Sequence, residues 1–372
     1  MISTVWLVLP GLLIWLCILL LPWRPWSTRE QLEPAPGGEP DLSAVTVLIP
    51  ARNEAEVLGA TLAGLQQQGA GLKIVLIDDQ STDDTVAIAR RSGLESSSIL
   101  TGAALPPGWS GKLWALHQGL QRATTDYLLL LDADIELLPG TLTALLNKIS
   151  SGPYELVSLM AYLRMTTFWE RLLMPAFIFF FKLLYPFAIA NSSSRWVAAA
   201  AGGGILVRRE ALLSVGGFDS LRQALIDDCA LARRFKNHGY RTWIGLTRSA
   251  LSRRRYESLH TIVEMVSRTA FTQLHYSVLL LLLCTLMMLA AFVLPVAALL
   301  TGQVLPVSIA CLLLMCVCYL PTLDYYRLNP LWTLTLPLTG LLYLLMTWNS
   351  ACKHWWGSGS FWKGRSYSRQ DH

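Results

Sequence analysis

The sequence predicts an α/β domain held at a membrane by one N-terminal and two or three C-terminal transmembrane helices. From residue 45 onwards, short apolar runs alternate with segments of helical periodicity, a pattern typical of a parallel sheet covered on both faces. Residues 1–23, 276–323 and 328–352 contain no charged side chain. Since about 20 apolar residues suffice to cross a bilayer, these stretches are long enough for membrane spans.

The first apolar stretch, residues 1–23, lacks a basic start and an Ala-x-Ala-like exit, so we interpret it as an uncleaved anchor. Arg24 and Arg29 follow it, and the positive-inside rule then places the next segment in the cytoplasm. Residues 276–323 fit two spans and residues 328–352 a third. Three full spans would leave the basic tail, residues 353–372, outside, against the charge rule. Either one stretch is re-entrant or interfacial, or the tail is external, and we favour a cytoplasmic tail.

Composition argues against two classes of protein. The seven cysteines lie inside apolar stretches or alone, with no zinc-ligand pair or disulfide pattern, in agreement with a reducing compartment. A net charge of +5 without a basic stripe and interleaved aromatic residues argues against a nucleic-acid partner. The same charge suits contact with anionic lipid headgroups.

The expected elements follow in chain order. Residues 24–42 are rich in Pro and Gly and predict a linker to a domain at residues 43–275. Residues 168–190 are apolar and aromatic but contain three charged side chains, which favours a helix in the membrane interface over a span. Strands are expected at residues 45–50, 73–77 and 127–131, and helices at residues 54–68, 82–91, 111–122, 139–149 and 229–238.

Acidic residues follow the strands where ligands bind in such sheets. Asp78 and Asp79 end the second strand, and Asp132 and Asp134 follow the third. Alternate residues of an extended segment point the same way, so Asp132 and Asp134 can share a hard divalent cation, Mg²⁺ or Mn²⁺, bridged to phosphate oxygens. The alternative is a solvated turn, just as the Ser/Thr/Asp run after Asp79 reads as helix capping.

Together, the motifs resemble the family 2 glycosyltransferases with a GT-A (Rossmann-like) fold. The ordered set is the run at residues 47–54 that includes Pro50 and Glu54, then Asp78-Asp79, Asp132-Ala133-Asp134 and Asp227-Asp228. The runs at residues 108–112, 201–204, 216–219 and 362–367 narrow the resemblance to the hopene-associated glycosyltransferases of bacterial hopanoid biosynthesis, and more distantly to ceramide glucosyltransferases.

The resemblance implies roles for named residues. Asp228, with Asp227 beside it, would be the catalytic base, and Asp134 with Asp132 would hold the metal. The donor, a nucleotide sugar and by family expectation a UDP-sugar, would contact Pro50, Glu54, Asp78, Asp79, Lys112, Asp132, Gly203 and Gly204. Contacts to acceptor or phosphate would come from Arg268, Arg255, Lys363 and Arg365. The alternative for Lys112 is an exposed lysine at a helix start, that for the arginines is binding of lipid headgroups, and that for the glycines is a plain turn.

The implied function is single, inverting transfer of a hexosyl group to a lipid acceptor at the bacterial inner membrane, with the catalytic domain in the cytoplasm. A motif of processive relatives, Gln/Arg-x-x-Arg-Trp, is reduced here to Arg268, which argues against polymer extrusion. The alternatives are transfer to a polyprenyl phosphate or carotenoid-like lipid, and a non-catalytic membrane scaffold.

Overall fold

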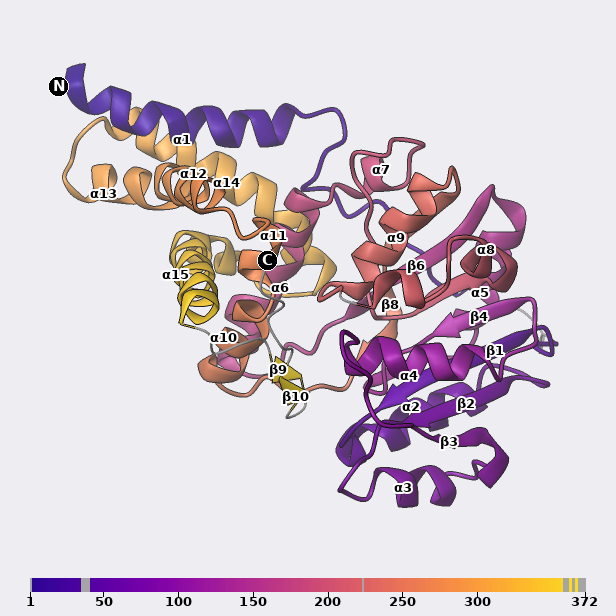
Figure 1. Cartoon of the computed structure of the whole chain (residues 1–372). Coiled ribbons are helices and arrows are strands. Elements are labelled where there is room, and N and C mark those ends of the chain that lie inside the picture. The colour runs from indigo at the N-terminus through magenta and orange to yellow at the C-terminus, as the bar shows by residue number, and fades with distance from the viewer. Residues whose placement is uncertain (1, 35–40, 223, 357–360, 363–364, 367–372) are drawn as a thin grey trace.

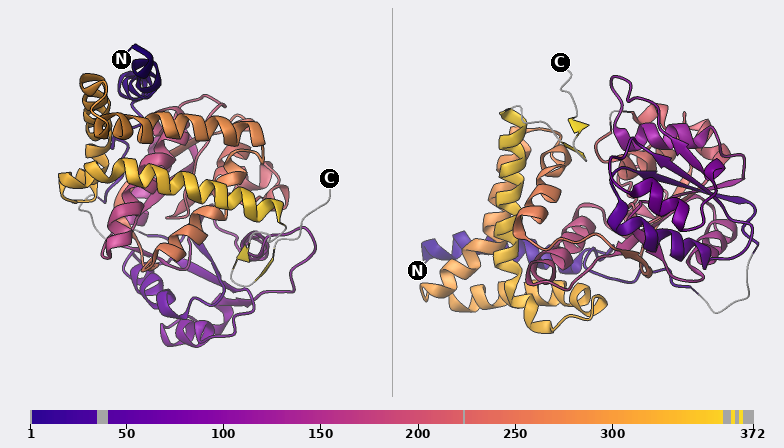
Figure 2. Two further views of the ribbon diagram at one scale, coloured as in Figure 1. Left: turned by 90° about the vertical axis from the view of Figure 1, so that its left-hand side faces the viewer. Right: turned by 90° about the horizontal axis from the view of Figure 1, so that it is seen from below.

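The computed structural model describes residues 2–34, 41–222, 224–356, 361–362 and 365–366. It has two parts, a sheet domain and a group of apolar helices that lies to one side of it (Figures 1 and 2). The predicted fold class, an α/β domain joined to apolar helices, is confirmed.

The central sheet has eight strands in the order β3-β2-β1-β4-β7-β6-β8-β5. β1 pairs in parallel with β2 and β4, and β2 with β3. β7 is antiparallel to both neighbours, and β5 is antiparallel to β8. The strands are β1 Val45–Ala51, β2 Lys73–Asp78, β3 Ile99–Thr101, β4 Tyr127–Leu130, β5 Ile135–Leu137, β6 Tyr154–Tyr162, β7 Ile205–Arg208 and β8 Arg241–Ser252.

The expectation of a parallel sheet is therefore right for β1 to β4 and for the β6–β8 pair, and wrong for β7 and β5, which run antiparallel to their neighbours. A parallel partner needs a crossover helix packed on the sheet. After β6 the chain instead leaves the sheet for the apolar helices and returns as β7, which runs against β6. The first three strands and the helices between them lie within a few residues of their predicted positions.

Helices cover both faces of the sheet, as predicted. One core packs α2 and α5 against one face, and a second packs α4, α8 and α9 against the other. Their bounds are α2 Ala55–Gln66, α3 Thr85–Arg91, α4 Gly111–Leu120, α5 Thr141–Ser151, α8 Arg209–Ser214 and α9 Asp227–Asn237.

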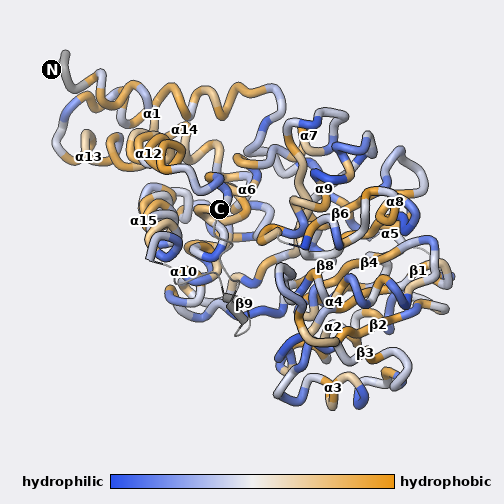
Figure 3. Tube along the Cα trace, in the orientation of Figure 1, coloured by the Kyte–Doolittle hydropathy of each residue, from blue (hydrophilic) through white to orange (hydrophobic). Residues whose placement is uncertain are grey.

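Three helical segments of the described chain are long and apolar enough to cross a membrane: Val278–Leu300, Leu305–Tyr325 and Pro330–Trp355, with the shorter Val5–Leu20 beside them. Figure 3 shows these segments as continuous hydrophobic stretches. They comprise α1 Ile2–Leu20, α12 Val278–Met288, a π-helical turn η3 Leu289–Val293, α13 Leu294–Leu300, α14 Leu305–Tyr325, η4 Pro330–Thr335 and α15 Leu336–Trp355. α1 lies along α14, whereas α12 and α15 run across that pair (Figures 1 and 2).

Helix α6, Phe168–Leu184, joins the two parts. Its side chains share a buried apolar cluster with Trp15 of α1 and with residues of α14 and α15. The hydroxyl of Tyr343 on α15 donates to the Leu173 carbonyl at 2.9 Å. The β6–β7 pairing brings both flanks of α6 into one sheet, so the segment does not divide the domain. Placement of α6 in the membrane interface remains a prediction.

Two buried charges of α6 hold neighbouring segments. The Lys182 ammonium donates to the Ser27 carbonyl, within the predicted linker. Burial lowers the pKa of Lys182 to about 8. The following residues pair with β8, since the Leu246 amide donates to the Glu30 carbonyl at 2.8 Å. The described part of the linker thus forms a parallel β-bridge with β8, between Gln31 and Leu246.

Glu170 is fully buried near the start of α6 and fixes the chain that leaves β8. One carboxylate oxygen accepts from the Thr166 and Thr167 amides in a capping box, and the other accepts from the Tyr256 amide at 3.0 Å. Residues 253–256 are therefore held by α6, the helix that joins the sheet domain to the apolar helices. The remaining elements are α7 Phe187–Ala190, α10 Leu259–Ser267, α11 Ala270–Gln273, and β9 Phe361–Trp362 paired with β10 Arg365–Ser366.

We expect Glu170→Ala to lower the free energy of unfolding by about 1–3 kcal/mol, because it leaves buried amide donors unpaired. Thermal melting of the detergent-solubilised protein measures this. Glu257→Ala is the matched control, since that side chain is exposed and its ion pair with Arg255 is long, at 3.8 Å. Equal melting temperatures for the two variants would contradict the structural role given to Glu170.

Candidate functional site

The site begins where β1, β2 and β4 end side by side. Ala51 and Asp78 are in register across β1 and β2, and the Leu131 amide donates to the Leu48 carbonyl at 3.1 Å. Asp78 and Asp79 are buried at this edge. Pro50 is the second-last residue of β1. The residues predicted to contact the nucleoside therefore lie at one edge of the sheet.

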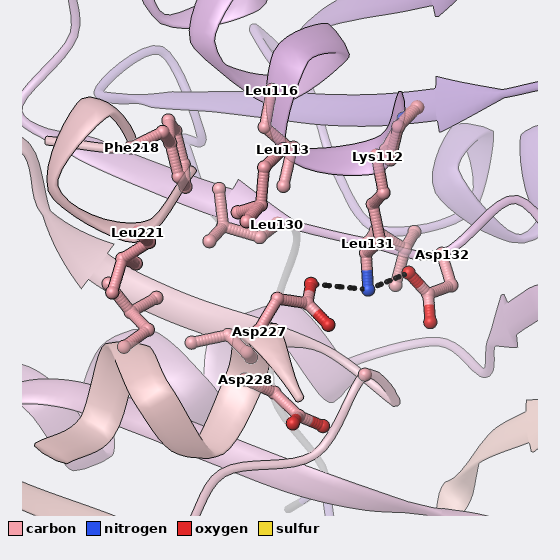
Figure 4. A pocket seen from close by; sticks show the side chains of 14 residues that line it. Lys112, Leu113, Leu116, Leu130, Leu131, Asp132, Phe218, Leu221, Asp227 and Asp228 are labelled. Carbon is pink, nitrogen blue, oxygen red and sulfur yellow. Dashed lines mark ion pairs between the residues drawn. The ribbon is translucent and has the colours of Figure 1, made fainter. Parts of the chain in front are cut away.

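Lys112 joins two other predicted site residues, Asp132 and Asp227 (Figure 4). Its ammonium lies 2.8 Å from Oδ1 of Asp132 and 3.0 Å from Oδ2 of Asp227. Ser110 caps α4, with its hydroxyl accepting from the Leu113 amide, and so sets Lys112 in the first turn of that helix. The Lys112 side chain is 22% exposed and forms an ion pair on two sides, so it is not the exposed helix-start lysine that was the alternative interpretation.

The electrostatics of this cluster follow from burial and from the close carboxylates. Burial alone would lower the pKa of Lys112, but Asp132, Asp227 and Asp228 raise it well above its usual value. Burial raises the pKa of Asp132 against the opposing effect of Lys112. Lys112 is therefore held as a cation, and its charge offsets only part of the acidic cluster.

Asp228 is the second residue of α9 and accepts from the Cys229 amide at 2.7 Å. Burial, followed by the charge of Asp227, raises its pKa to about 7. A carboxylate with a pKa near neutral can accept a proton and release it again at physiological pH. This is the property required of a general base.

Asp132 and Asp134 do not form one extended pair. They lie in a turn between β4 and β5, closed by the Ile135 amide donating to the Asp132 carbonyl at 3.1 Å. Asp132 faces Lys112, whereas Oδ2 of Asp134 faces Arg254 at 3.3 Å. The expectation that both side chains point the same way, as in a strand, is therefore wrong because the chain turns at Ala133.

Arg254 is a site residue that the sequence reasoning did not select. Its guanidinium contacts Asp134 and, at 3.0 Å, Glu54, which lies at the start of α2. Burial would lower the pKa of Arg254, but Asp134 and Glu54 raise it further. Arg254 is the middle of three consecutive arginines, residues 253–255, of which the sequence analysis selected only Arg255. The alternation of this run along an extended segment, with the middle residue facing inward, was the available signal.

Gly202 is a second missed residue. A methyl group built on it would lie 2.3 Å from Oδ2 of Asp132, so only glycine leaves room for that carboxylate. Gly203, which was predicted to contact the donor, instead packs on the backbone of β6. A methyl group built on it would lie 2.5 Å from the Ala161 nitrogen. Gly204 adopts a φ of +135°, which favours glycine. Two of the three neighbouring glycines thus serve the backbone itself.

The predicted acceptor or phosphate contacts are dispersed. The side chain of Arg255 is mostly exposed and faces Glu257. Arg268 ends α10, where its charge acts on Tyr256. Arg365 lies in β10, and Lys363 lies outside the described residues. Neither Arg255 nor Arg268 lines the cavity beside Lys112.

A divalent cation was predicted at Asp132 and Asp134. Within the described residues there is no group of three or more His, Cys, Asp or Glu side chains arranged to hold a metal. The two carboxylates nevertheless fit such an ion chemically. Asp132 uses Oδ1 for Lys112 and Asp134 uses Oδ2 for Arg254, which leaves the second oxygen of each outside these ion pairs. Ligands from a bound phosphate and from water complete such a site.

A small cavity adjoins the cluster, with a volume of about 20 Å³. It is lined by Pro50, Lys112, Leu113, Leu116, Leu130, Leu131, Asp132, Gly202, Ile205, Phe218, Leu221, Asp227, Asp228 and Leu231. The volume is on the order of one water molecule. Pro50, Lys112 and Asp132 of the predicted donor residues therefore share one cavity with Asp227 and Asp228, and this cavity must widen to admit a sugar.

We expect Gly202→Ala to push Asp132 away from Lys112 and to weaken binding of the nucleotide sugar at least tenfold. Titration calorimetry on the purified protein measures this. Gly59→Ala, within helix α2, is the matched control, because its methyl group would meet only Ile88 of α3, at 3.8 Å. Unchanged affinity in Gly202→Ala would show that the Asp132 position does not matter for the donor.

Comparisons with known proteins agree with this geometry. The family model described as "Glycosyl transferase family 2" matches residues 46–216. The 4,4'-diaponeurosporenoate glycosyltransferase of Staphylococcus aureus strain MRSA252 is 29% identical over 198 residues, which are 52% of this chain and 51% of that protein. The counterpart from strain bovine RF122 / ET3-1 is 28% identical over the same length. The chain thus spans about half the length of the curated relatives it matches.

Among solved structures, a mannosyltransferase from Pyrobaculum calidifontis, in complex with GDP-Man and Mn²⁺, covers 96% of this chain and 98% of its own. Its TM-score is 0.56 at 20% identity, a likeness that shows the fold alone. The likeness extends over the sheet domain and the apolar helices together. Residues 46–216 accordingly match the glycosyl transferase family 2 model, on a GT-A-like sheet joined to helices that could span a membrane.

Proposed function

We propose that this protein transfers a hexosyl group from a nucleotide sugar to a membrane lipid, with inversion at the anomeric carbon. One observation carries the proposal: the Lys112 ammonium touches both Asp132, at the end of β4, and Asp227, beside Asp228. The residues expected to bind the donor and the residue expected to activate the acceptor thus meet around a single cation.

The donor half consists of residues at the ends of β1, β2 and β4. Asp78 and Asp79 would contact the nucleoside, and Lys112 would place its positive charge on the diphosphate. A cation at that point offsets the charge that develops on the leaving phosphate. Asp134 and Asp132 would hold the divalent ion, which when bound stabilises the same leaving charge.

The acceptor half rests on Asp228. Its carboxylate would take the proton of the acceptor hydroxyl while that oxygen attacks the anomeric carbon opposite the departing diphosphate. A single displacement of this kind inverts the configuration. Asp227, paired with Lys112, keeps a negative charge beside Asp228 and so supports the raised pKa that suits a base.

The lipid class rests on the surroundings and on the relatives. Apolar helices adjoin the domain, and the S. aureus relatives are named for diaponeurosporenoate, a carotenoid-like lipid. That name supports the carotenoid-like alternative. A hopanoid acceptor rests on the sequence motifs alone. The bacterial inner membrane, with the domain in the cytoplasm, remains the proposed location on the evidence of Arg24 and Arg29.

We expect Asp228→Asn to lower transfer by about 10²–10⁴-fold while donor affinity stays unchanged, because the amide cannot take the proton. For the unmodified protein, kcat/KM should fall as the pH drops below about 7, where Asp228 is protonated, and level off above it. Radiolabelled transfer from UDP- and GDP-hexoses into lipid measures both. Asp219→Asn, an exposed carboxylate paired with Arg222, is the control. Normal turnover in Asp228→Asn would remove Asp228 from this role.

The scaffold alternative is tested separately through the metal. With Mg²⁺ or Mn²⁺, the purified protein should hydrolyse or transfer the donor sugar, and Asp134→Ala should reduce this at least a hundredfold. Chelation of the metal should have a similar effect on the unmodified protein. Asp84→Ala, at the start of α3, is the control. Donor binding that needs no metal and leads to no turnover would instead favour the scaffold.

A further inference from the structure

The two carboxylates predicted to hold a divalent ion each face a cation of the chain itself. Oδ1 of Asp132 lies 2.8 Å from the Lys112 ammonium, and Oδ2 of Asp134 lies 3.3 Å from Nε of Arg254. Partial burial would lower the pKa of both cations, but the carboxylates that face them raise it, so both side chains keep their charge. The proposed mechanism gives Lys112 a place on the diphosphate and leaves Arg254 without a role.

The fold, rather than a chance side-chain orientation, places the Arg254 charge at Asp134. The amide of the preceding residue, Arg253, donates to the Asp134 carbonyl at 2.7 Å, and the amide of Tyr256 donates to the buried Glu170 carboxylate at 3.0 Å. The chain is thus held on both sides of Arg254, whose side chain is only 33% exposed. From this fixed backbone the guanidinium reaches the turn that contains Asp134.

Arg254 offsets a local excess of negative charge. Its guanidinium lies 3.0 Å from Glu54 as well as beside Asp134, so one cation serves two carboxylates whose side chains are only 8% and 11% exposed. Asp132 adds a further carboxylate at the start of the same turn. Loss of the Arg254 charge would therefore make the turn more negative and strengthen its attraction for a divalent ion.

The neighbouring arginines make other contacts. Arg253 pairs with Glu136 of β5, and Arg52, just after β1, donates to the Asp79 carbonyl oxygen at 2.5 Å. Within the described residues, Arg254 is the cation whose ion pair includes Asp134. The charge that acts on Asp134 at contact distance is thus that of a single side chain.

A divalent ion that reached this turn alone would meet both cations. An ion shared by Asp132 and Asp134 comes close to Lys112 and Arg254, and like charges repel strongly where water is partly excluded. A nucleoside diphosphate changes this balance, because its oxygens can ligate the ion and also accept hydrogen bonds from an ammonium and a guanidinium. Each cation can then exchange a carboxylate oxygen for a phosphate oxygen.

Resting on the function proposed above, we propose that Arg254, together with Lys112, prevents a divalent ion from binding alone and lets it bind only with the diphosphate of the donor. Arg254 exchanges Asp134 for a phosphate oxygen when the ion and the diphosphate arrive together. Ion and nucleotide then bind with positive coupling, which is reciprocal, so each raises the affinity of the other by the same factor. Arg254 is thus a specificity-determining residue that selects the complex of ion and diphosphate over the ion.

The test measures Mn²⁺ binding itself and needs no lipid acceptor. Electron paramagnetic resonance of the full-length protein in detergent gives the Mn²⁺ affinity alone and with UDP or GDP, after correction for the Mn²⁺ that the nucleotide binds in solution. We expect the nucleotide to tighten Mn²⁺ binding at least tenfold in the unmodified protein. Arg254→Met, which keeps the side-chain length without the charge, should bind Mn²⁺ alone at least tenfold more tightly and lose most of this coupling.

Two further variants isolate the charge at this position. Arg254→Lys keeps a cation and should leave Mn²⁺ alone as weakly bound as in the unmodified protein. Arg253→Met is the matched control, because it removes the adjacent charge, paired with Glu136, and keeps the backbone amide that donates to Asp134. We expect it to change Mn²⁺ affinity less than twofold.

The outcomes separate this inference from the proposed function. Equal Mn²⁺ affinity with and without nucleotide in the unmodified protein would overturn the inference without any variant. Unchanged or weaker Mn²⁺ binding in Arg254→Met would show that the guanidinium only holds Asp134 in place, and equal tightening in Arg253→Met would show a general charge effect. Either result would overturn it. Absence of Mn²⁺ and nucleotide binding in every combination would contradict the donor half of the proposed function and this inference with it, whereas intact coupling without transfer to lipid would contradict the proposed function alone.

Discussion

The site depends on one half-buried ammonium. Lys112 is the cation that holds the turn after β4 to the start of α9, since Asp132 and Asp227 approach it from opposite sides of the cluster. Without it, half-buried carboxylates would face one another, and like charges at that range disfavour ionisation. The positions of Asp132 and Asp228 therefore follow from where α4 begins, and Ser110 sets that point by capping the helix.

A second constraint couples the site to the membrane-facing helices. Glu170 of α6 accepts from the Tyr256 amide, and two residues earlier Arg254 reaches Asp134 and Glu54. A buried carboxylate in the joining helix thus fixes the backbone from which the guanidinium extends. Through Lys182, the same helix also holds the segment that follows α1. The sheet domain and the apolar helices share buried polar contacts as well as an apolar interface, so movement of one part would strain the other.

The sequence was informative where local patterns decide the structure. Alternating apolar runs located β1, β2 and β4, and the uncharged stretches located the apolar helices. It failed for the second half of the sheet, because the antiparallel placement of β7 depends on where the chain returns after a long excursion. It also missed Gly202 and Arg254, whose roles come from contacts with Asp132 and Asp134 that only the tertiary fold creates.

The charge balance explains why such a site needs a cation from outside. Among the described residues, the ion pairs around the cluster join Asp132 and Asp227 to Lys112, and Asp134 and Glu54 to Arg254, while Asp228 adds a further carboxylate. A nucleotide diphosphate brings further negative charge into this excess, and close like charges cost several kcal/mol where water is excluded. A divalent ion at Asp132 and Asp134 would reverse that repulsion, and Lys112 could then leave Asp132 for the diphosphate. The charge of Asp227 would remain beside Asp228, where it keeps that carboxylate basic enough to take a proton.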